Sequence, residues 1–258
     1  MGDRLKFSLC TEMIFGGEPL HEILPAVRDA GYGAFEFWHW GNKDIAAIEA
    51  AMATTGLKTA TFCVKNGNLV DEAKRGEFID GLKETLPVAK RLGCATLITT
   101  VGQRLIGVSD DAQTKSVIAG LCAAAPIVED AGITLAVEPL NILVDHAGYF
   151  LDRSDAGFMI LAEVGSPNVK LLFDIYHQQI TEGNLIANIT KNIGAIGHFH
   201  AADVPGRHDP GTGEINYLNV VDAIAKTGYD GYFGLEYSPV GDKTASIRNV
   251  LKYLNGRA

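Results

Sequence analysis

A chain of 258 residues that is 47% hydrophobic can bury the core of one large domain or of two small ones. Its formal net charge of -9 disfavours a nucleic-acid partner, which would usually need a basic face, and disfavours binding to an anionic membrane surface. No stretch approaches the roughly 18 uninterrupted apolar residues of a membrane span, and the amino-terminal residues lack the apolar segment of a signal peptide. We therefore expect a cytoplasmic protein that acts on small molecules and has no membrane partner.

Short apolar runs alternate with helical spacing along the whole chain, at roughly 30 residues per pair. Glycines such as Gly31, Gly93 and Gly132 mark the ends of predicted helices. The predicted strands are residues 5–10, 34–38, 57–64, 95–101, 133–138, 169–174, 195–201 and 231–237. The predicted helices that follow them are residues 19–30, 45–52, 73–92, 110–131, 148–164, 184–191, 216–226 and 244–254.

This alternation predicts the fold. Because each strand is followed by a helix, neighbouring strands must run parallel through right-handed crossovers. Eight such units are the number that closes a (β/α)8 TIM barrel. No linker, low-complexity tract or shift in composition marks a second domain. We therefore predict an α/β fold in which residues 1–258 form a single TIM-barrel domain.

Four predicted strands end in a conspicuous polar residue: Glu138, Asp174, His200 and Glu236. The carboxyl ends of barrel strands meet at one rim, so these side chains should converge. Each acid alone could simply bind a helix N-terminus or an arginine, but independent explanations for all of them are less economical than one shared site. Converging carboxylates repel one another unless a cation lies between them. Oxygen donors, one imidazole and no thiolate favour one divalent ion, Mn²⁺ or Mg²⁺ or else Co²⁺, over structural zinc.

His198 and His200 are alternate residues of one predicted strand and therefore face the same side. Two histidines on one strand are usually hydrogen-bonded core residues. His200 is favoured as a metal ligand only because potential ligands also end other predicted strands. Trp38, Trp40 and Tyr237 lie near the ends of strands and either line a small polyol pocket or belong to the core; we include Trp40 among the predicted substrate-binding residues.

These residues, and above all the loop sequence V-P-G-R-H-D-P-G-T-G-E-I-N-Y at 204–217, resemble the hydroxypyruvate isomerase family of xylose-isomerase-like TIM barrels. The resemblance covers the whole chain. It implies that Glu138 and Glu236 both hold the metal and exchange protons with the substrate, that His177 and Arg207 bind substrate oxygens, and that the protein is a homo-oligomer, a dimer or a tetramer. Hydroxypyruvate isomerases often have Gln at the position of His200, whereas the related ketose 3-epimerases have His there.

The expected chemistry is removal of a proton from a carbon next to a carbonyl, which requires that the resulting enediolate be stabilised by a cation. Return of the proton to the neighbouring carbon is an isomerisation of the aldose-ketose type, as in hydroxypyruvate to tartronate semialdehyde. Return to the same carbon from the other face is epimerisation by a ketose 3-epimerase. An inosose-type dehydratase would begin in the same way, so all these activities in carbohydrate metabolism stay open.

Two further interpretations fit less well. A metal-dependent endonuclease acting at abasic DNA would need several more histidines and a basic face than this chain offers. A sugar-binding barrel without catalysis would not require both Glu138 and Glu236.

Overall fold

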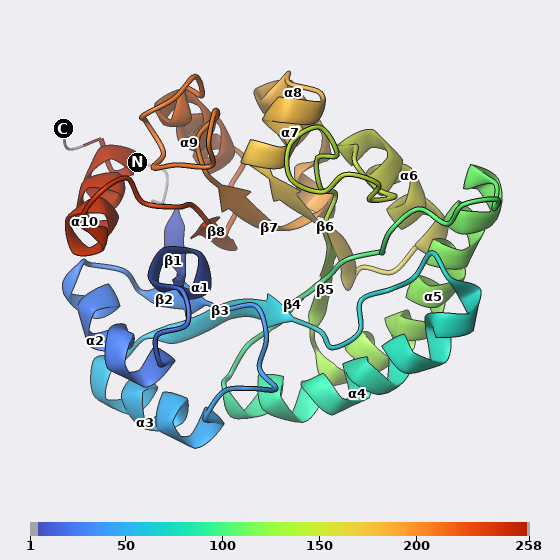
Figure 1. Ribbon diagram of the computed structural model, residues 1–258, viewed down its shortest axis with the longest axis horizontal. Coiled ribbons are helices and arrows are strands. Elements are labelled where there is room, and N and C mark those ends of the chain that lie inside the picture. Colours follow the sequence, from blue (N-terminus) through green and yellow to red (C-terminus); the bar gives the residue numbers. More distant parts are fainter. Residues whose placement is uncertain (1–4, 257–258) are drawn as a thin grey trace.

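Eight short apolar strands pair in parallel and in sequence order, and β8 closes on β1, as Figure 1 shows. The computed structural model describes residues 5–256. The strands are β1 (Lys6–Cys10), β2 (Ala34–Glu36), β3 (Lys58–Cys63), β4 (Thr96–Thr99), β5 (Thr134–Val137), β6 (Val169–Asp174), β7 (Ile196–Ala201) and β8 (Tyr232–Leu235). The predicted (β/α)8 barrel is confirmed.

Helices surround this barrel (Figure 1). They are α1 (Thr11–Phe15), α2 (Leu20–Asp29), α3 (Ile45–Thr55), α4 (Arg75–Arg91), α5 (Asp110–Ala131), α6 (Ser154–Val164), α7 (Ile175–Thr181), α8 (Leu185–Asn192), α9 (Tyr217–Lys226) and α10 (Lys243–Leu254), with 3-10 turns η1 (Glu72–Lys74) and η2 (Ile193–Ala195). Several begin at a side chain that accepts a backbone N–H, as Asp44, Ser109 and Asp242 do.

The observed helices differ from the predicted ones in two respects. The helix predicted from residue 148 begins only at Ser154, because Gly148 has a positive φ of 85° and Tyr149 pairs with Gln103 as an isolated bridge. The one-turn and two-turn helices α1 and α7 were not predicted, since each follows its strand directly and no turn residue separates the two. Helix α7 starts where the Asp174 side chain accepts the N–H of His177 at 3.1 Å.

Most of the hydrophobic core lies between the barrel and its helices. Phe199 and Phe233 stack at 6.0 Å between ring centroids, and Tyr217 of α9 packs edge-on against Phe233. Alternation along the strands then turns the residues on either side of Phe199 into the barrel. Ile98, Ala136 and Leu172 form a small apolar cluster that is separate from this core. In the described part of the chain, no helix combines the length and the apolar character needed to cross a membrane.

Candidate metal centre and active site

The four predicted ligands lie together at the carboxyl ends of β5 to β8. One ligand atom from each of Glu138, Asp174, His200 and Glu236 lies within 4.8 Å of the others, and all four residues are buried. Backbone hydrogen bonds to the neighbouring strands hold two of them in place. The N–H of Glu138 donates to the carbonyl oxygen of Thr99, and that of Glu236 donates to the carbonyl oxygen of Ala201, both at 3.0 Å. We call this group the rim cluster.

The rim cluster has the donor chemistry of a divalent-cation site. His200 Nδ1 lies 3.5 Å from Glu138 Oε1 and 3.6 Å from Glu236 Oε2, and it has no hydrogen-bond partner among residues 5–256. A buried, unpaired nitrogen beside carboxylates is costly unless a cation or a proton lies between them. Three carboxylates and one imidazole therefore fit Mn²⁺ or Mg²⁺.

The carboxylates of the rim cluster are electrostatically unequal. Burial raises the pKa of Glu138 and that of Asp174 above their ordinary values. Burial opposes the charge of Glu236 as well, but the positive groups of Arg207 and His200 hold its pKa at about 2. Glu236 is also the most tightly bound, because Trp38 Nε1 donates to its Oε1 at 2.6 Å and Arg207 donates to its Oε2.

A second polar group lies deeper in the barrel and shares His200. The carboxylate of Glu36, on β2, accepts from His198 Nε2 at 3.0 Å and from His200 Nε2 at 2.8 Å, and it also accepts from the hydroxyl of Ser8. All four side chains are buried. Although burial alone would raise it, the two imidazoles bring the pKa of Glu36 well below its ordinary value. We call Ser8, Glu36, His198 and His200 the inner cluster.

Arg207 reaches the rim cluster from the loop after β7. Its guanidinium donates to Glu236, lies 3.8 Å from Asp174 Oδ2 and sits 5.3 Å from the ring centre of Tyr176. Asp203 stabilises this loop, because its carboxylate accepts from the backbone N–H groups of Val204, Gly211 and Ile215. Burial opposes its charge, but Glu236 and Asp174 raise the pKa of Arg207, so the guanidinium stays positive.

His177 stands beside the cluster in the first turn of α7. Its Nδ1 lies 3.3 Å from the backbone N–H of Asn141 and 2.6 Å from the Asn141 side-chain nitrogen. The backbone group can only donate, so Nδ1 accepts and a neutral ring carries its proton on Nε2. Burial, and then the charge of Arg207, lower the pKa of His177 well below its ordinary value. Nε2 lies 3.6 Å from Asp174 Oδ2 and is unpaired in the described chain.

The aromatic residues near the strand ends are arranged differently from one another. Trp40 Nε1 donates to Thr85 on α4 at 3.1 Å, whereas the indole that contacts the rim cluster is that of Trp38. Tyr237 is fully buried and its hydroxyl is bonded to Ser246 at 2.8 Å. Of these three aromatic residues, Trp38 is therefore the one whose side chain bonds to a rim-cluster residue, Glu236.

Sequence reasoning missed Glu36, and no motif marks it. It is one acid in the run Ala34-Phe35-Glu36-Phe37-Trp38, and its histidine partners lie 162 and 164 residues further along the chain. Asn141, in the loop after β5, is of a residue type that usually makes local turns. It does so, since its Oδ1 accepts from the N–H of Val144 at 2.9 Å, but the same side chain also contacts His177.

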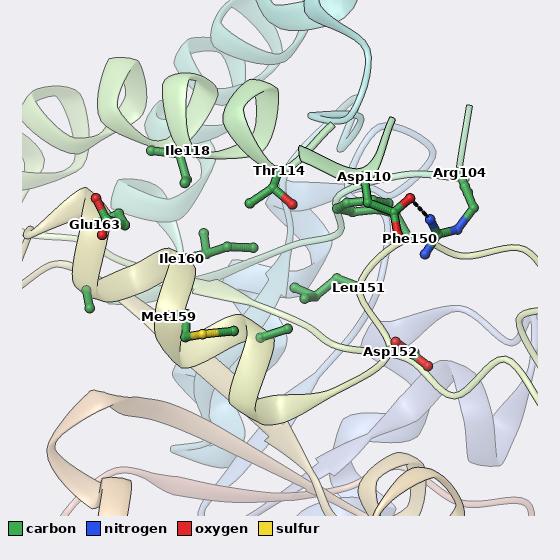
Figure 2. A pocket seen from close by; sticks show the side chains of 12 residues that line it. Arg104, Asp110, Thr114, Ile118, Phe150, Leu151, Asp152, Met159, Ile160 and Glu163 are labelled. Carbon is green, nitrogen blue, oxygen red and sulfur yellow. Dashed lines mark hydrogen bonds and ion pairs between the residues drawn. The ribbon is translucent and has the colours of Figure 1, made fainter. Parts of the chain in front are cut away.

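A groove of about 520 Å³ lies outside the barrel between α5 and α6, where Thr114 and Ile118 face Met159 and Ile160 (Figure 2). Arg104 and Asp110 form an ion pair at one end of it. None of the predicted site residues lines this groove. We therefore place the candidate site at the rim cluster.

A family model described as a xylose isomerase-like TIM barrel matches residues 24–256. Hydroxypyruvate isomerase of Escherichia coli is 30% identical over 253 residues, covering 95% of this chain and 97% of that protein. 2-Oxo-tetronate isomerase of Cupriavidus necator is 30% identical over 258 residues, covering 96% of this chain and 98% of that protein.

Solved structures give the same fold. The crystal structure of AP endonuclease, family 2, from Brucella melitensis has a TM-score of 0.91 at 29% identity, covering 96% of this chain and 99% of that one. L-ribulose 3-epimerase has a TM-score of 0.84 at 20% identity, covering 98% of this chain and 94% of that one, and identity that low shows the shared fold alone.

Proposed function

We propose that this chain, which belongs to the xylose isomerase-like TIM barrel family, is a divalent-metal-dependent isomerase of a small hydroxy-carbonyl compound, of the aldose-ketose type. Relatives that cover nearly the whole chain are isomerases by name, which makes an isomerase the first choice and a carbohydrate epimerase the alternative. The observation that carries the proposal is the convergence of Glu138, Asp174, His200 and Glu236 at one rim. Hydroxypyruvate and 2-oxo-tetronate, after which the two relatives are named, are the first substrates to test.

The four rim residues would hold one Mn²⁺ or Mg²⁺, or Co²⁺. When bound, such an ion supplies the positive charge that stabilises an enediolate formed next to the substrate carbonyl. To bind such an ion, the protein must supply buried oxygen and nitrogen donors with little competing water. The four buried side chains of the rim cluster fulfil this requirement.

Glu138 and Glu236 are the proposed base and acid. They follow β5 and β8, which flank the two strands that carry Asp174 and His200, so they can act on a substrate from two sides. One carboxylate takes the proton from the carbon next to the carbonyl, and that proton returns to the neighbouring carbon in isomerisation.

Arg207 and His177 are the proposed substrate-binding groups. The Arg207 guanidinium lies at the edge of the rim cluster and presents several N–H donors, which suits a substrate carboxylate or hydroxyl oxygen. His177 offers one neutral N–H at Nε2. Trp40 stays a prediction, and its indole N–H is occupied by Thr85.

One observation favours the alternative of a ketose 3-epimerase: residue 200 is His in an H-x-H context, as the sequence resemblance implies for epimerases. An inosose-type dehydratase is a third candidate, which mass spectrometry distinguishes because dehydration removes water. The similarity to the Brucella AP endonuclease also justifies one assay on abasic duplex DNA, although the net charge of -9 disfavours binding to it.

The test is proton NMR in deuterium oxide with Mg²⁺, over hydroxypyruvate, 2-oxo-tetronate and short ketoses. We expect loss of the signal of the proton next to the carbonyl, with a product that differs in mass from the substrate only by the deuterium it has taken up. Exchange with inversion at the same carbon would replace isomerisation by epimerisation. If no substrate exchanges while abasic DNA is cleaved, the proposed function is wrong. The predicted dimer or tetramer can be checked on the same sample by light scattering.

A further inference from the structure

Glu36 determines which nitrogen of His200 faces the rim cluster. The carboxylate of Glu36 can only accept hydrogen bonds, and His200 Nε2 lies 2.8 Å from it, so that nitrogen must carry a proton. In the neutral ring, which is the form that can ligate a metal, the lone pair is then on Nδ1. That is the nitrogen that lies 3.5 Å from Glu138 and 3.6 Å from Glu236 and has no partner in the described structure.

The barrel is built so that this contact can form. Glu36 is on β2 and His200 on β7, and β8 and β1 lie between those strands. In the register of the sheet, His200 pairs with Gly234 and Gly234 pairs with Ser8. A Cβ at Gly234 would lie 2.8 Å from His200 Cδ2 and 2.9 Å from Glu36 Oε2. The absence of a side chain at Gly234 therefore lets the carboxylate and the ring meet.

The inner cluster is itself saturated. One carboxylate oxygen of Glu36 accepts from Ser8 and His198, and the other accepts from His200. Separations of 3.0 and 2.8 Å are those of direct hydrogen bonds. Glu36, His198 and His200 could hold an ion by residue type, but both oxygens of Glu36 are already bonded to the Nε2 atoms of the two rings. The group therefore works as support for His200 and not as a second metal site.

We propose that Glu36 is a positioning residue that fixes His200 as an Nδ1 metal ligand and strengthens that ligand through its negative charge. This inference rests on the proposed function, since it presumes that the rim cluster binds a divalent ion. A carboxylate that accepts the far N–H of a ligating histidine orients the ring, sets its tautomer and makes it more basic. Glu36 is placed to do all three without touching substrate.

The variant that tests this is Glu36→Gln. An amide has one acceptor oxygen where the carboxylate serves Ser8, His198 and His200, and it has no charge, so His200 is a weaker ligand in either amide orientation. The matched control is His198→Gln, which replaces the other imidazole by an amide N–H that can still donate to Glu36. Both variants alter one buried side chain of the same cluster.

The measurement is binding of Mn²⁺ to chelator-treated protein, by calorimetry and by electron paramagnetic resonance of the free ion. We expect one Mn²⁺ per wild-type chain, about 10- to 100-fold weaker binding by Glu36→Gln, and less than about threefold change in His198→Gln. Equal affinity of wild type and Glu36→Gln would overturn the inference while the proposed function stands. Absence of Mn²⁺ binding by the wild type would overturn both, and two ions per chain would identify the inner cluster as a second site.

A second measurement needs no variant and so does not depend on the stability of Glu36→Gln. In the Mg²⁺-bound wild type labelled with ¹⁵N-histidine, two-bond nitrogen–proton correlations report the proton position in each ring. We expect His200 to carry its proton on Nε2 alone. A proton on Nδ1 of His200 in the metal-bound protein would contradict the inference.

Discussion

The rim cluster and the inner cluster share His200, yet they differ in how completely their polar atoms are paired. In the inner cluster each oxygen of Glu36 accepts a hydrogen bond. At the rim, His200 Nδ1, His177 Nε2 and Arg207 Nε all lack partners within the part of the chain that the structure describes. Buried polar groups are paired as a rule, so unpaired ones need an explanation.

The difference assigns a task to each cluster. A saturated group gains nothing from a ligand and contributes orientation and stability. An unsaturated, buried group is costly by itself and is explained if a cation and a substrate complete it. Mutations should therefore affect chemistry at the rim and mainly geometry or stability in the inner cluster.

The largest expected effect is at the rim. Glu138→Gln and Glu236→Gln should each lower turnover at least about 100-fold, because an amide can neither take nor give the proton. The measurement is the deuterium-exchange rate with the best substrate, and circular dichroism checks the fold. Glu163→Gln, on the exposed face of α6, makes the same chemical change far from the cluster and should keep full activity. Residual activity above about a tenth of wild type in either rim variant would contradict the acid-base role.

Metal removal should also distinguish the role of the rim cluster from that of the inner cluster. A chelator should abolish activity, and Mn²⁺ or Mg²⁺ should restore it. Ion present at 100 times its Kd stabilises the folded chain by about 2.7 kcal/mol, which is a rise of roughly 5–10 °C in Tm for a chain of this size. His198→Gln should keep that rise, whereas Asp174→Asn should lose most of it. A Tm that does not respond to either ion would be evidence against the rim as a metal site.

The rim was predictable because it depends on strand ends. Glu138, Asp174 and Glu236 each close an apolar run, and the parallel barrel brings the ends of such runs together whatever the sequence distance. The predicted barrel is confirmed, and its order places β5 to β8 side by side.

The inner cluster was not predictable in the same way. The Glu36 side chain crosses the barrel interior to a strand that does not pair with its own, and no local pattern encodes such a contact. Trp38 and Trp40 show a second limit. Strand β2 ends at Glu36, so the alternation that would orient the following residues no longer applies, and only the coordinates show that Trp38 contacts Glu236.

Gly234→Ala should test the geometry of the inner cluster through stability. The added methyl group would press on the His200 ring and the Glu36 carboxylate, and overpacking of a buried site typically costs about 1–3 kcal/mol. Thermal unfolding should show a lower Tm. Gly194→Ala is the control, because a Cβ there meets no atom within 4 Å in residues 5–256, and we expect a change within about 0.5 kcal/mol. Equal Tm values for the two variants would mean that the interior is looser than these distances imply.

The smallest expected effect concerns Asn141, which lies outside both clusters but holds the ring of His177. Asn141→Ala removes the side-chain contact at 2.6 Å and leaves the backbone N–H at 3.3 Å, so His177 should keep its tautomer but lose orientation. A hydrogen bond is worth about 0.5–1.5 kcal/mol net, which corresponds to a rise in KM of roughly 2- to 12-fold with a smaller change in kcat. Asp145→Asn is the control, because it keeps an acceptor oxygen for the Asn141 side chain and leaves the Asn141 contact with His177 in place. Equal KM values for the two variants would show that substrate does not use the unpaired Nε2 of His177, and the rim would then need a different explanation for that atom.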